Sequence, residues 1–356
     1  MRVALLGDIA LFGCCSRPGY FNTIGDYLSS FDYVVGNLET PFSLKRKTFG
    51  AKSAYIYASP ESSSILKQLN LSAVNLANNH MFDYGEEGYE LTKKILAESG
   101  IEWFGTEGKE LKVELDNNRI AFAGFCCYTT NPILCVKYGD YGVNAYNINK
   151  AREILQGFLL EGYLPIFSVH AGIEHVNYPS LEHILAARSL STVGEFIYYG
   201  HHPHVIQGVE VFNGSLISHS LGNFCFDNIY TKASGNKPLI ELSDNNRTGM
   251  ILELTIESNA IVNWEERVIH IGEDSISLLK DSGLLSDYNV ELQTCGNHME
   301  QYNIMRNKII TEREDGRQAM RNLSWYVKRL KPRYLNMLLN SRRNRLLFDS
   351  NVRALL

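Results

Sequence analysis

The stretch Phe196-Ile-Tyr-Tyr-Gly-His-His-Pro-His204 decides the fold, because it joins a buried strand to a cluster of histidines. Residues Phe196–Tyr199 form the short apolar run that is typical of a fully buried strand. His201, His202 and His204 follow at once, and three imidazoles within four residues need polar or metal partners. Sites in open α/β sheets form where strands end. The stretch therefore predicts an α/β sheet with a polar site at its strand ends.

The same alternation of buried strands and amphipathic segments recurs along the chain. Further strands are predicted at Val3–Leu6, Tyr33–Val35, Ala73–Leu76, Ile120–Phe125 and Ile166–Val169. Helical patterns separate them, near Phe21–Ser29, Glu61–Gln68, Gly88–Ser99, Asn149–Leu160 and Leu181–Gly194. Strands that alternate with helices indicate an α/β sheet. From about Val205 to Ile271 strand follows strand, which predicts a second, more antiparallel sheet.

Residue types that bind metals stand at the ends of these strands. The segments concerned are Gly7-Asp8, Asn37-Leu-Glu39, Asn78-Asn79-His80, Ser168-Val-His170 and Gly200-His-His-Pro-His204. A pair of divalent metals needs a carboxylate between them, with imidazole and carboxamide groups around it. Oxygen and nitrogen donors without thiolate suit Mn, Fe or Zn in a catalytic site rather than a structural zinc. The set predicts a two-metal centre that activates water, with a nearby imidazole to protonate a leaving group.

Singly, these residues also have plain structural interpretations. Asp8 alone could be a turn residue that caps a helix, and His170 at a strand end could be a core histidine. Asp83 is predicted to cap the helix that starts near Gly85 rather than to touch a metal. His175 is predicted to be a surface or structural residue. Taken together, the placement of so many ligand types at strand ends favours a metal site over coincidence.

In order and spacing, six motifs resemble the CapA/PgsA family of bacterial capsule and poly-γ-glutamate biosynthesis proteins: Gly7-Asp8, Asn37-Leu-Glu39, Asn78-Asn79-His80-x-x-Asp83-x-Gly85, His170-x-Gly172, Gly200-His-His-Pro-His204 and Ser220-Leu-Gly-Asn-Phe224. That family is similar to the calcineurin-like metallophosphoesterases, and the resemblance covers roughly residues 1–230. It implies a four-layer αββα sandwich, with two sheets face to face, helices outside and metals at the strand ends. We assign residues 1–272 to this metallophosphoesterase-like domain and residues 273–356 to a helical, basic C-terminal extension.

The resemblance implies a site for two divalent metal ions, which are Mn, Fe or Zn with manganese favoured. The ligands carried over are Asp8, Glu39, Asn79, His170, His202 and His204. Asp8 would bind the first metal and Glu39 would bridge the pair, whereas Asn79 and His170 would bind the second. Metallophosphoesterases usually have a histidine two residues after this aspartate, but the chain has Ala10 there. The first metal is then one protein ligand short.

Three further residues are expected to act beside the metals. The resemblance makes His80 the general acid, Asn223 a residue that orients ligands or substrate, and His201 a neighbour of the ligands. The family's aromatic residue after His170 is replaced by Ala171, which alters the wall of the pocket.

The implied function is a metal-dependent, phosphoesterase-like hydrolase in capsule, exopolysaccharide or poly-γ-glutamate biosynthesis. Water activated by two metals would attack, His80 would protonate the leaving group, and the substrate would be an anionic polymer or a glycan precursor. One alternative is a non-hydrolytic assembly or binding component of a membrane-associated polymer synthase. Another is a transferase that uses the same metal site on a glycan acceptor.

The C-terminal part of the chain is basic, although the whole chain has a net charge of −5. Residues 316–356 contain ten Lys/Arg and one acid. The pattern predicts a long helix over residues 298–330 that stops near Pro332, then a second, basic helix to about Leu347. These helices are either a solvated face or a contact with anionic lipid or a membrane-bound synthase. No nucleic-acid partner is expected, because no recognised module accompanies the basic patch.

The overall composition is that of a globular protein, with 356 residues, 45% hydrophobic and 21% charged. Seven cysteines without a CxxC spacing indicate free thiols in a reducing compartment rather than disulfides or a zinc knuckle. Asp8 interrupts the apolar N-terminal run, which argues against a signal peptide. No stretch approaches the roughly 18 apolar residues of a membrane span. The expected location is the cytoplasm, with peripheral contact at the inner face of the membrane.

Overall fold

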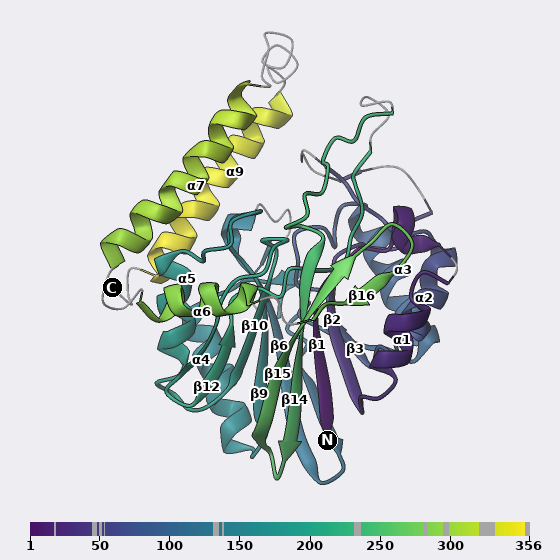
Figure 1. Cartoon of the computed structure of the whole chain (residues 1–356), viewed down its shortest axis with the longest axis vertical. Coiled ribbons are helices and arrows are strands. Elements are labelled where there is room, and N and C mark those ends of the chain that lie inside the picture. The colour runs from purple at the N-terminus through teal and green to yellow at the C-terminus, as the bar shows by residue number, and fades with distance from the viewer. Residues whose placement is uncertain are drawn as a thin grey trace.

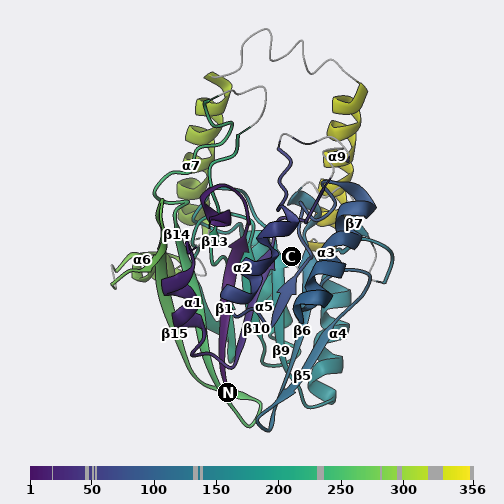
Figure 2. The ribbon, with the colours of Figure 1, turned by 90° about the vertical axis from the view of Figure 1, so that its right-hand side faces the viewer.

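Two β-sheets lie face to face and helices cover their outer sides (Figure 1, Figure 2). The computed structural model describes residues 1–17, 19–44, 48–49, 52, 54–130, 135–136, 139–230, 236–280, 283–294, 299–319 and 332–352.

The first sheet has the order β16-β15-β14-β1-β2-β3-β4, and β13 also pairs with β1. Its strands are β1 (Arg2–Ile9), β2 (Tyr33–Leu38), β3 (Ala73–Asn75), β4 (Glu102–Phe104), β13 (Asn223–Cys225), β14 (Thr248–Glu257), β15 (Ala260–Ile271) and β16 (Ile276–Leu278). The strands from β1 to β4 are parallel, and β13 is parallel to β1. The strands from β14 to β16 are antiparallel additions to one side.

The second sheet has the order β11-β12-β10-β9-β6-β5. Its strands are β5 (Leu111–Leu115), β6 (Asn118–Cys126), β9 (Leu164–His170), β10 (Ile197–His201), β11 (Val209–Phe212) and β12 (Ser215–Ser218). The four central strands are parallel, and β5 and β11 are antiparallel at the two edges. The short strands β7 (Cys135–Val136) and β8 (Val143–Asn144) form a separate pair.

Helices and short turns lie between the strands or follow the last strand. They are α1 (Asn22–Leu28), α2 (Ser63–Gln68), α3 (Gly85–Ser99), α4 (Ile148–Leu160), α5 (Leu181–Leu190), α6 (Leu284–Thr294), α7 (Met299–Ala319) and α9 (Pro332–Val352), with short 3₁₀ turns η1 (Gly13–Ser16), η2 (Pro60–Ser62) and η3 (Tyr128–Thr130).

The apolar strands explain the layers, because alternate side chains of a strand point to opposite faces. In β1, Val3 and Leu5 enter the core between the sheets, whereas Leu6 belongs to the core beneath α1, α2 and α3. In β6, Phe122 faces the inter-sheet core and Phe125 packs with residues of α4 and α5. The central strands β1 and β6 are therefore buried on both faces, whereas β5 and β15, which lie at or next to a sheet edge, have exposed positions. The result is the four-layer αββα sandwich that was predicted.

All six predicted strands and the five predicted helices of residues 1–204 are present, with ends that differ by a few residues. The prediction that residues 205–271 build a second sheet of their own is wrong. The strands β11 and β12 join β10, whereas β13 and β14 join β1. The reason is that β1 and β10 each offer one free edge, and pairing with a buried strand satisfies more backbone groups than a separate sheet would.

The C-terminal helices extend beyond the sheets and flank the end at which the parallel strands stop (Figure 2). The predicted helix over residues 298–330 corresponds to α7 over 299–319, and residues 320–331 lie outside the described residues. Pro332 opens α9, consistent with the preference of proline for the first helical turn. In α7, the Tyr302 hydroxyl donates to the Pro179 carbonyl at 2.8 Å. The boundary at residue 272 stays a prediction.

Within the described ranges, we find no helix whose length and apolar character would let it cross a membrane. The cysteines Cys14, Cys15, Cys126, Cys127 and Cys225 form no disulfide and are buried, in line with their interpretation as small core residues.

Candidate metal centre

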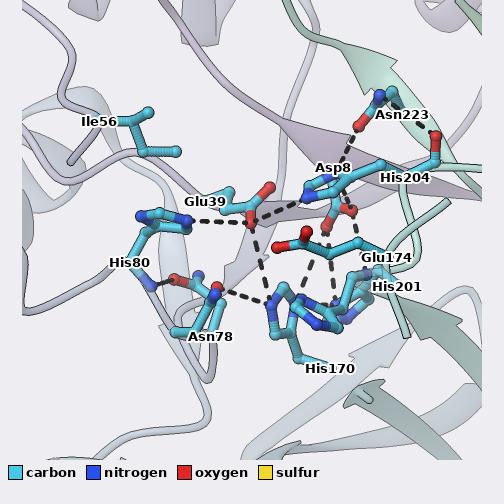
Figure 3. Close-up of polar contacts among 12 residues, drawn as sticks. Asp8, Glu39, Ile56, Asn78, His80, His170, Glu174, His201, His204 and Asn223 are labelled. Carbon is cyan, nitrogen blue, oxygen red and sulfur yellow. Dashed lines mark hydrogen bonds and ion pairs between the residues drawn. The ribbon is translucent and has the colours of Figure 1, made fainter. Parts of the chain in front are cut away.

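The carboxyl ends of parallel strands from both sheets bring the predicted site residues together (Figure 3). Asp8 lies near the end of β1, Glu39 directly follows β2, and His170 and His201 end β9 and β10. The other predicted residues lie in the loops after β3 and β10 and at the start of β13: Asn79, His80, His202, His204 and Asn223. All nine therefore gather at one edge of the sandwich, although they come from six different parts of the chain.

Two groups of buried side chains could each hold a metal ion. The first contains Asp8, His170 and His201, the second contains Asp8, Glu39 and His204, and within each group the ligand atoms lie within 4.8 Å of one another. Asp8 belongs to both groups. Its Oδ1 is 3.8 Å from His201 Nδ1, and its Oδ2 is 3.3 Å from His204 Nδ1. Asp8 thus has the position of a bridging carboxylate, the role predicted for Glu39; the assignment of individual ligands stays a prediction.

The imidazole rings of His170 and His201 face one another, with 2.9 Å between their Nδ1 atoms. The other nitrogens are already engaged. His170 Nε2 is 2.9 Å from the Asn79 Oδ1, and His201 Nε2 is 2.7 Å from the Ser168 hydroxyl. If each Nε2–H donates outward, both Nδ1 lone pairs point to the same spot beside Asp8. Outer hydrogen bonds of this kind fix the tautomer of metal-binding histidines.

The most direct sign of a cation is an unsatisfied carboxylate. Both oxygens of Glu39 are fully buried, and no group among the described residues hydrogen-bonds to either of them. Burial raises the pKa of Glu39 well above its usual range, and the negative charge of Asp8 adds to the effect. A buried carboxylate that accepts no hydrogen bond is costly unless it binds a proton or a cation. His202 Nδ1 is likewise buried without a described partner. The residues present therefore fit a divalent metal.

The electrostatics of the pocket favour positive charge. Burial alone would lower the pKa of His204, but the carboxylates of Glu39 and Asp8 outweigh it and raise that pKa to about 10. Burial lowers the pKa of His202 to about 3 and that of His170 well below its ordinary value. These imidazoles are therefore neutral, the form that binds metals.

Asp83 orients the imidazole of His80, the predicted general acid. The Nδ1 of His80 lies 2.7 Å from Asp83 Oδ2, and its Nε2 lies 4.0 Å from Glu39 Oε1. The prediction that Asp83 caps the following helix is wrong. The residue at the N-cap of α3 is Tyr84, which makes no side-chain cap bond. Asp83 is instead fully buried, and it accepts from His80, from the Ile56 amide at 2.9 Å and from Lys52.

Several residues of the site have no clear sequence signal. Lys52 is buried with its Nζ 2.5 Å from Asp83 Oδ1, and nothing around it in the sequence marks it as polar core. Glu174 lines the pocket, and its interactions with His202 and His204 outweigh the opposing effect of burial and lower its pKa to about 2. His175, predicted to be structural, also lines this pocket and contacts Asn246 at 2.6 Å. The sequence signal that could have indicated Glu174 is its position two residues after the motif His170-x-Gly172.

The loop after β10 adopts an unusual backbone. His202 and His204 have φ values of 99° and 56°, a region that side chains rarely occupy. Such outliers persist only where the surroundings impose them, and they gather at functional sites. Asn223 contributes to this constraint, because its Oδ1 lies 2.9 Å from His204 Nδ1. This position suits the predicted orienting role of Asn223.

Two glycines permit the close approach of strands that the site needs. A Cβ on Gly7 would lie 2.0 Å from the Gly222 oxygen, and one on Gly200 would lie 1.9 Å from the His219 oxygen. Only glycine fits at these positions, which set β1 against β13 and β10 against β12.

A pocket of about 130 Å³ opens beside the ligands. Its lining includes polar and apolar groups: Lys52, His80, Glu174, His204, Phe226 and Ile229. The fold and the site together define an α/β sandwich protein with a candidate metal centre that is open to small ligands.

The family model described as bacterial capsule synthesis protein PGA_cap matches residues 14–228. The chain belongs to this family, which confirms the resemblance. Capsule biosynthesis protein CapA of Bacillus anthracis is 32% identical over 227 residues, which are 60% of this chain and 54% of that protein. PGA biosynthesis protein CapA of Bacillus subtilis (strain 168) is 30% identical over 272 residues, which are 74% of this chain and 68% of that protein. The chain thus spans only about half the length of the first of these relatives.

Solved structures also show similarity. One is a novel phosphatase from Mycoplasma pneumoniae, with a TM-score of 0.46 and 15% identity over 76% of this chain and 93% of that chain. A similarity of this size does not bear on activity.

Proposed function

We propose that this chain is a metal-dependent, phosphoesterase-like enzyme that acts in capsule, exopolysaccharide or poly-γ-glutamate biosynthesis. The observation that carries the proposal is Glu39. Its buried carboxylate accepts no hydrogen bond from the described residues, and it faces His80 across 4.0 Å. A carboxylate that needs a cation, beside an imidazole with one nitrogen already bonded, is the pairing expected in metal-assisted ester cleavage.

Five residues of the site would bind the metals. Asp8, Glu39, His170 and His204 would hold the metals, together with His201, which was predicted to lie outside the ligands but belongs to one of the two groups. His202 belongs to neither group, and the ligand roles of Asn79 and His202 stay predictions. Bound divalent metals supply a water of lowered pKa and neutralise charge on a phosphoryl group.

His80, Asp83 and Lys52 would act on the leaving group and on the anionic part of the substrate. Asp83 accepts from His80 Nδ1 and so keeps Nε2 directed at the pocket. A protonated Nε2 can then donate to the departing oxygen. Lys52 adds a buried cation to the lining of the same pocket, where an anionic group would sit.

The test compares two phosphodiesters with manganese added, in wild type and in His80→Gln. Bis(p-nitrophenyl) phosphate releases a weakly basic phenolate, whereas glycerophosphocholine releases an alkoxide that needs a proton. We expect metal-dependent turnover of both by the wild type. His80→Gln should slow only the second substrate, by about 10²-fold, as is typical of a lost general acid.

The outcomes separate the hypotheses. Absence of metal-dependent turnover in the wild type would contradict the enzymatic proposal. Turnover that needs an added sugar alcohol as acceptor would identify the protein as a transferase. An equal loss on both substrates in His80→Gln would rule out the general-acid role.

One observation favours a second role, contact with a membrane or a membrane-bound synthase. Helix α9 exposes five leucines and three arginines to solvent: Leu335, Leu338, Leu339, Leu346, Leu347, Arg342, Arg343 and Arg345. Apolar side chains beside arginines are suited to the surface of an anionic bilayer. We therefore propose peripheral contact with anionic lipid through α9, with or without catalysis.

This second proposal predicts co-sedimentation with vesicles that contain phosphatidylserine. Binding should fall at least about fivefold in Leu338→Glu/Leu339→Glu, because two apolar groups are replaced by groups that anionic lipid repels. The matched control is Leu160→Glu, since Leu160 at the end of α4 is also exposed. Equal binding to pure phosphatidylcholine, or equal binding by the double variant, would contradict the proposal.

A further inference from the structure

A second pocket lies beside the metal centre and has a different chemical character. Four partly exposed or exposed aromatic residues contribute to its lining, namely Phe12, Tyr55, Tyr57 and Tyr230. Hydroxyl, amide and carboxylate groups complete it: Ser16, Ser59, Ser62, Asn228 and Asp227. Its volume is about 330 Å³, larger than that of the pocket at the metal centre. Leu11, Gly13, Ile56 and Ile229 also line this pocket, which we call the aromatic groove.

The groove is continuous with the metal centre. Ile229 lines both pockets, and the neighbouring residues Ala54 and Tyr55 line one pocket each. Phe12 of the groove packs edge-on against Phe226 with 5.3 Å between ring centres, and Phe226 packs against His204 at 4.9 Å. Ile56 connects the two in another way, because its amide donates to Asp83 while its side chain lines the groove. A ligand anchored at the metals therefore has the groove as its next contact.

The charges of the two pockets differ. The pocket at the metals contains Lys52 and several histidines, which suit an anionic group. Among the described residues that line the groove, Asp227 is the single charged group and there is no lysine or arginine. Both carboxylate oxygens of Asp227 already accept backbone amides, from Cys14 and Asn228, each at 2.7 Å. A carboxylate-rich segment of a polymer would meet no cation there, and it would be repelled by Asp227.

The composition of the groove matches a sugar ring. Apolar and aromatic walls with a few placed polar groups are typical of small-molecule sites. The axial C–H groups of a pyranose pack on aromatic faces, while its hydroxyls exchange hydrogen bonds with serine, amide and carboxylate groups. Tyr230 supplies an accessible aromatic side chain, since 55% of the surface of this residue is exposed.

We infer that the aromatic groove binds an uncharged sugar residue adjacent to the anionic group held at the metal centre. The substrate class would then be a phosphoester of a glycan rather than a polymer of glutamate. The link to a phosphoester rests on the proposed function, whereas the binding of sugar does not.

The test measures sugar binding in the presence of a chelator, so that it does not depend on metal chemistry. Saturation-transfer NMR and titration would be run on the full chain with chitotetraose and maltotetraose as probes, and with a γ-linked glutamate pentamer for comparison. We expect saturable binding of at least one tetrasaccharide. Tyr230→Ala and Tyr57→Ala should each weaken it about tenfold, the scale of one lost aromatic anchor. Tyr141→Ala is the control, because Tyr141 is an exposed tyrosine outside the groove.

Each outcome has one meaning. Tetrasaccharide binding that is weakened in the groove variants and kept in Tyr141→Ala supports the inference, even if no phosphodiester is turned over. Preference for the glutamate pentamer overturns it, as does the failure of both tetrasaccharides to bind. Sugar binding that survives both groove substitutions also overturns it, because the sugar must then bind elsewhere. Failure of the metal-dependent turnover assay would reject the proposed function alone.

Discussion

Asp8→Asn should remove both metals and lower phosphodiester turnover by about 10⁴-fold, since two-metal sites supply several kcal/mol of transition-state stabilisation and each 1.36 kcal/mol is a factor of ten. The reason is the shared position of this residue. Asp8 is the carboxylate common to both candidate ligand groups, with one oxygen toward each. Removing its charge weakens both sites at once, whereas removing Glu39 or His170 would weaken one.

The variant keeps the shape of the side chain, so the fold should survive. Metal content by mass spectrometry gives the direct readout. Thermal unfolding gives a second one, because a metal at a hundred times its Kd adds about 2.7 kcal/mol. For a chain of 356 residues, that corresponds to a fall of roughly 4 °C for each metal when a chelator is added to the wild type. The chelator should leave the unfolding temperature of Asp8→Asn unchanged.

Glu253→Gln provides the matched control for Asp8→Asn. Glu253 is a buried carboxylate on β14, the strand paired with β1, and it bonds to Tyr27 and Arg267 away from the site. It should keep its metals and its turnover. A wild-type content of metal in Asp8→Asn would show that the two groups are not the binding site. Loss of turnover with full metal content would assign Asp8 a role other than that of a ligand.

The sequence allowed the layers and most of the site to be predicted because both depend on local patterns. Apolar runs such as Val3–Leu6 identify buried strands, and parallel strands place their carboxyl ends together. Asp8, Glu39 and His170 could therefore be assigned to one site although they are far apart in the chain.

What could not be predicted depends on contacts between distant residues. Nothing local states that β14 pairs with β1, some 250 residues away, rather than with β12. The role of Asp83 failed for the same reason. Seen alone, an aspartate before Gly85 is a helix cap, and only the arrival of Lys52 and His80 in space turns it into a buried partner. The groove formed by Phe12, Tyr57 and Tyr230 likewise joins three separate segments.

Lys52→Met should destabilise the fold by about 3 to 5 kcal/mol, the cost of leaving a buried charge without its partner. The ammonium of Lys52 lies 2.5 Å from Asp83 Oδ1, and both side chains are almost fully buried, at 5% and 0% exposure. Methionine keeps the apolar stem but not the charge, so among the described residues Asp83 would retain His80 and the Ile56 amide as partners. Urea unfolding in the presence of a chelator measures this cost without any contribution from bound metal.

Two further variants separate burial from the mere presence of an ion pair. Lys112 and Glu161 form a contact of 2.6 Å, nearly the same length, but their side chains are 39% and 51% exposed. Lys112→Met should therefore cost less than about 1 kcal/mol, as exposed pairs do. The double variant Lys52→Met/Asp83→Asn should be more stable than Lys52→Met alone, because no unpaired charge remains in it. If Lys52→Met unfolds at the same urea concentration as the wild type, the carboxylate is not held by Lys52, and His80 must then be oriented by Asp83 without that support.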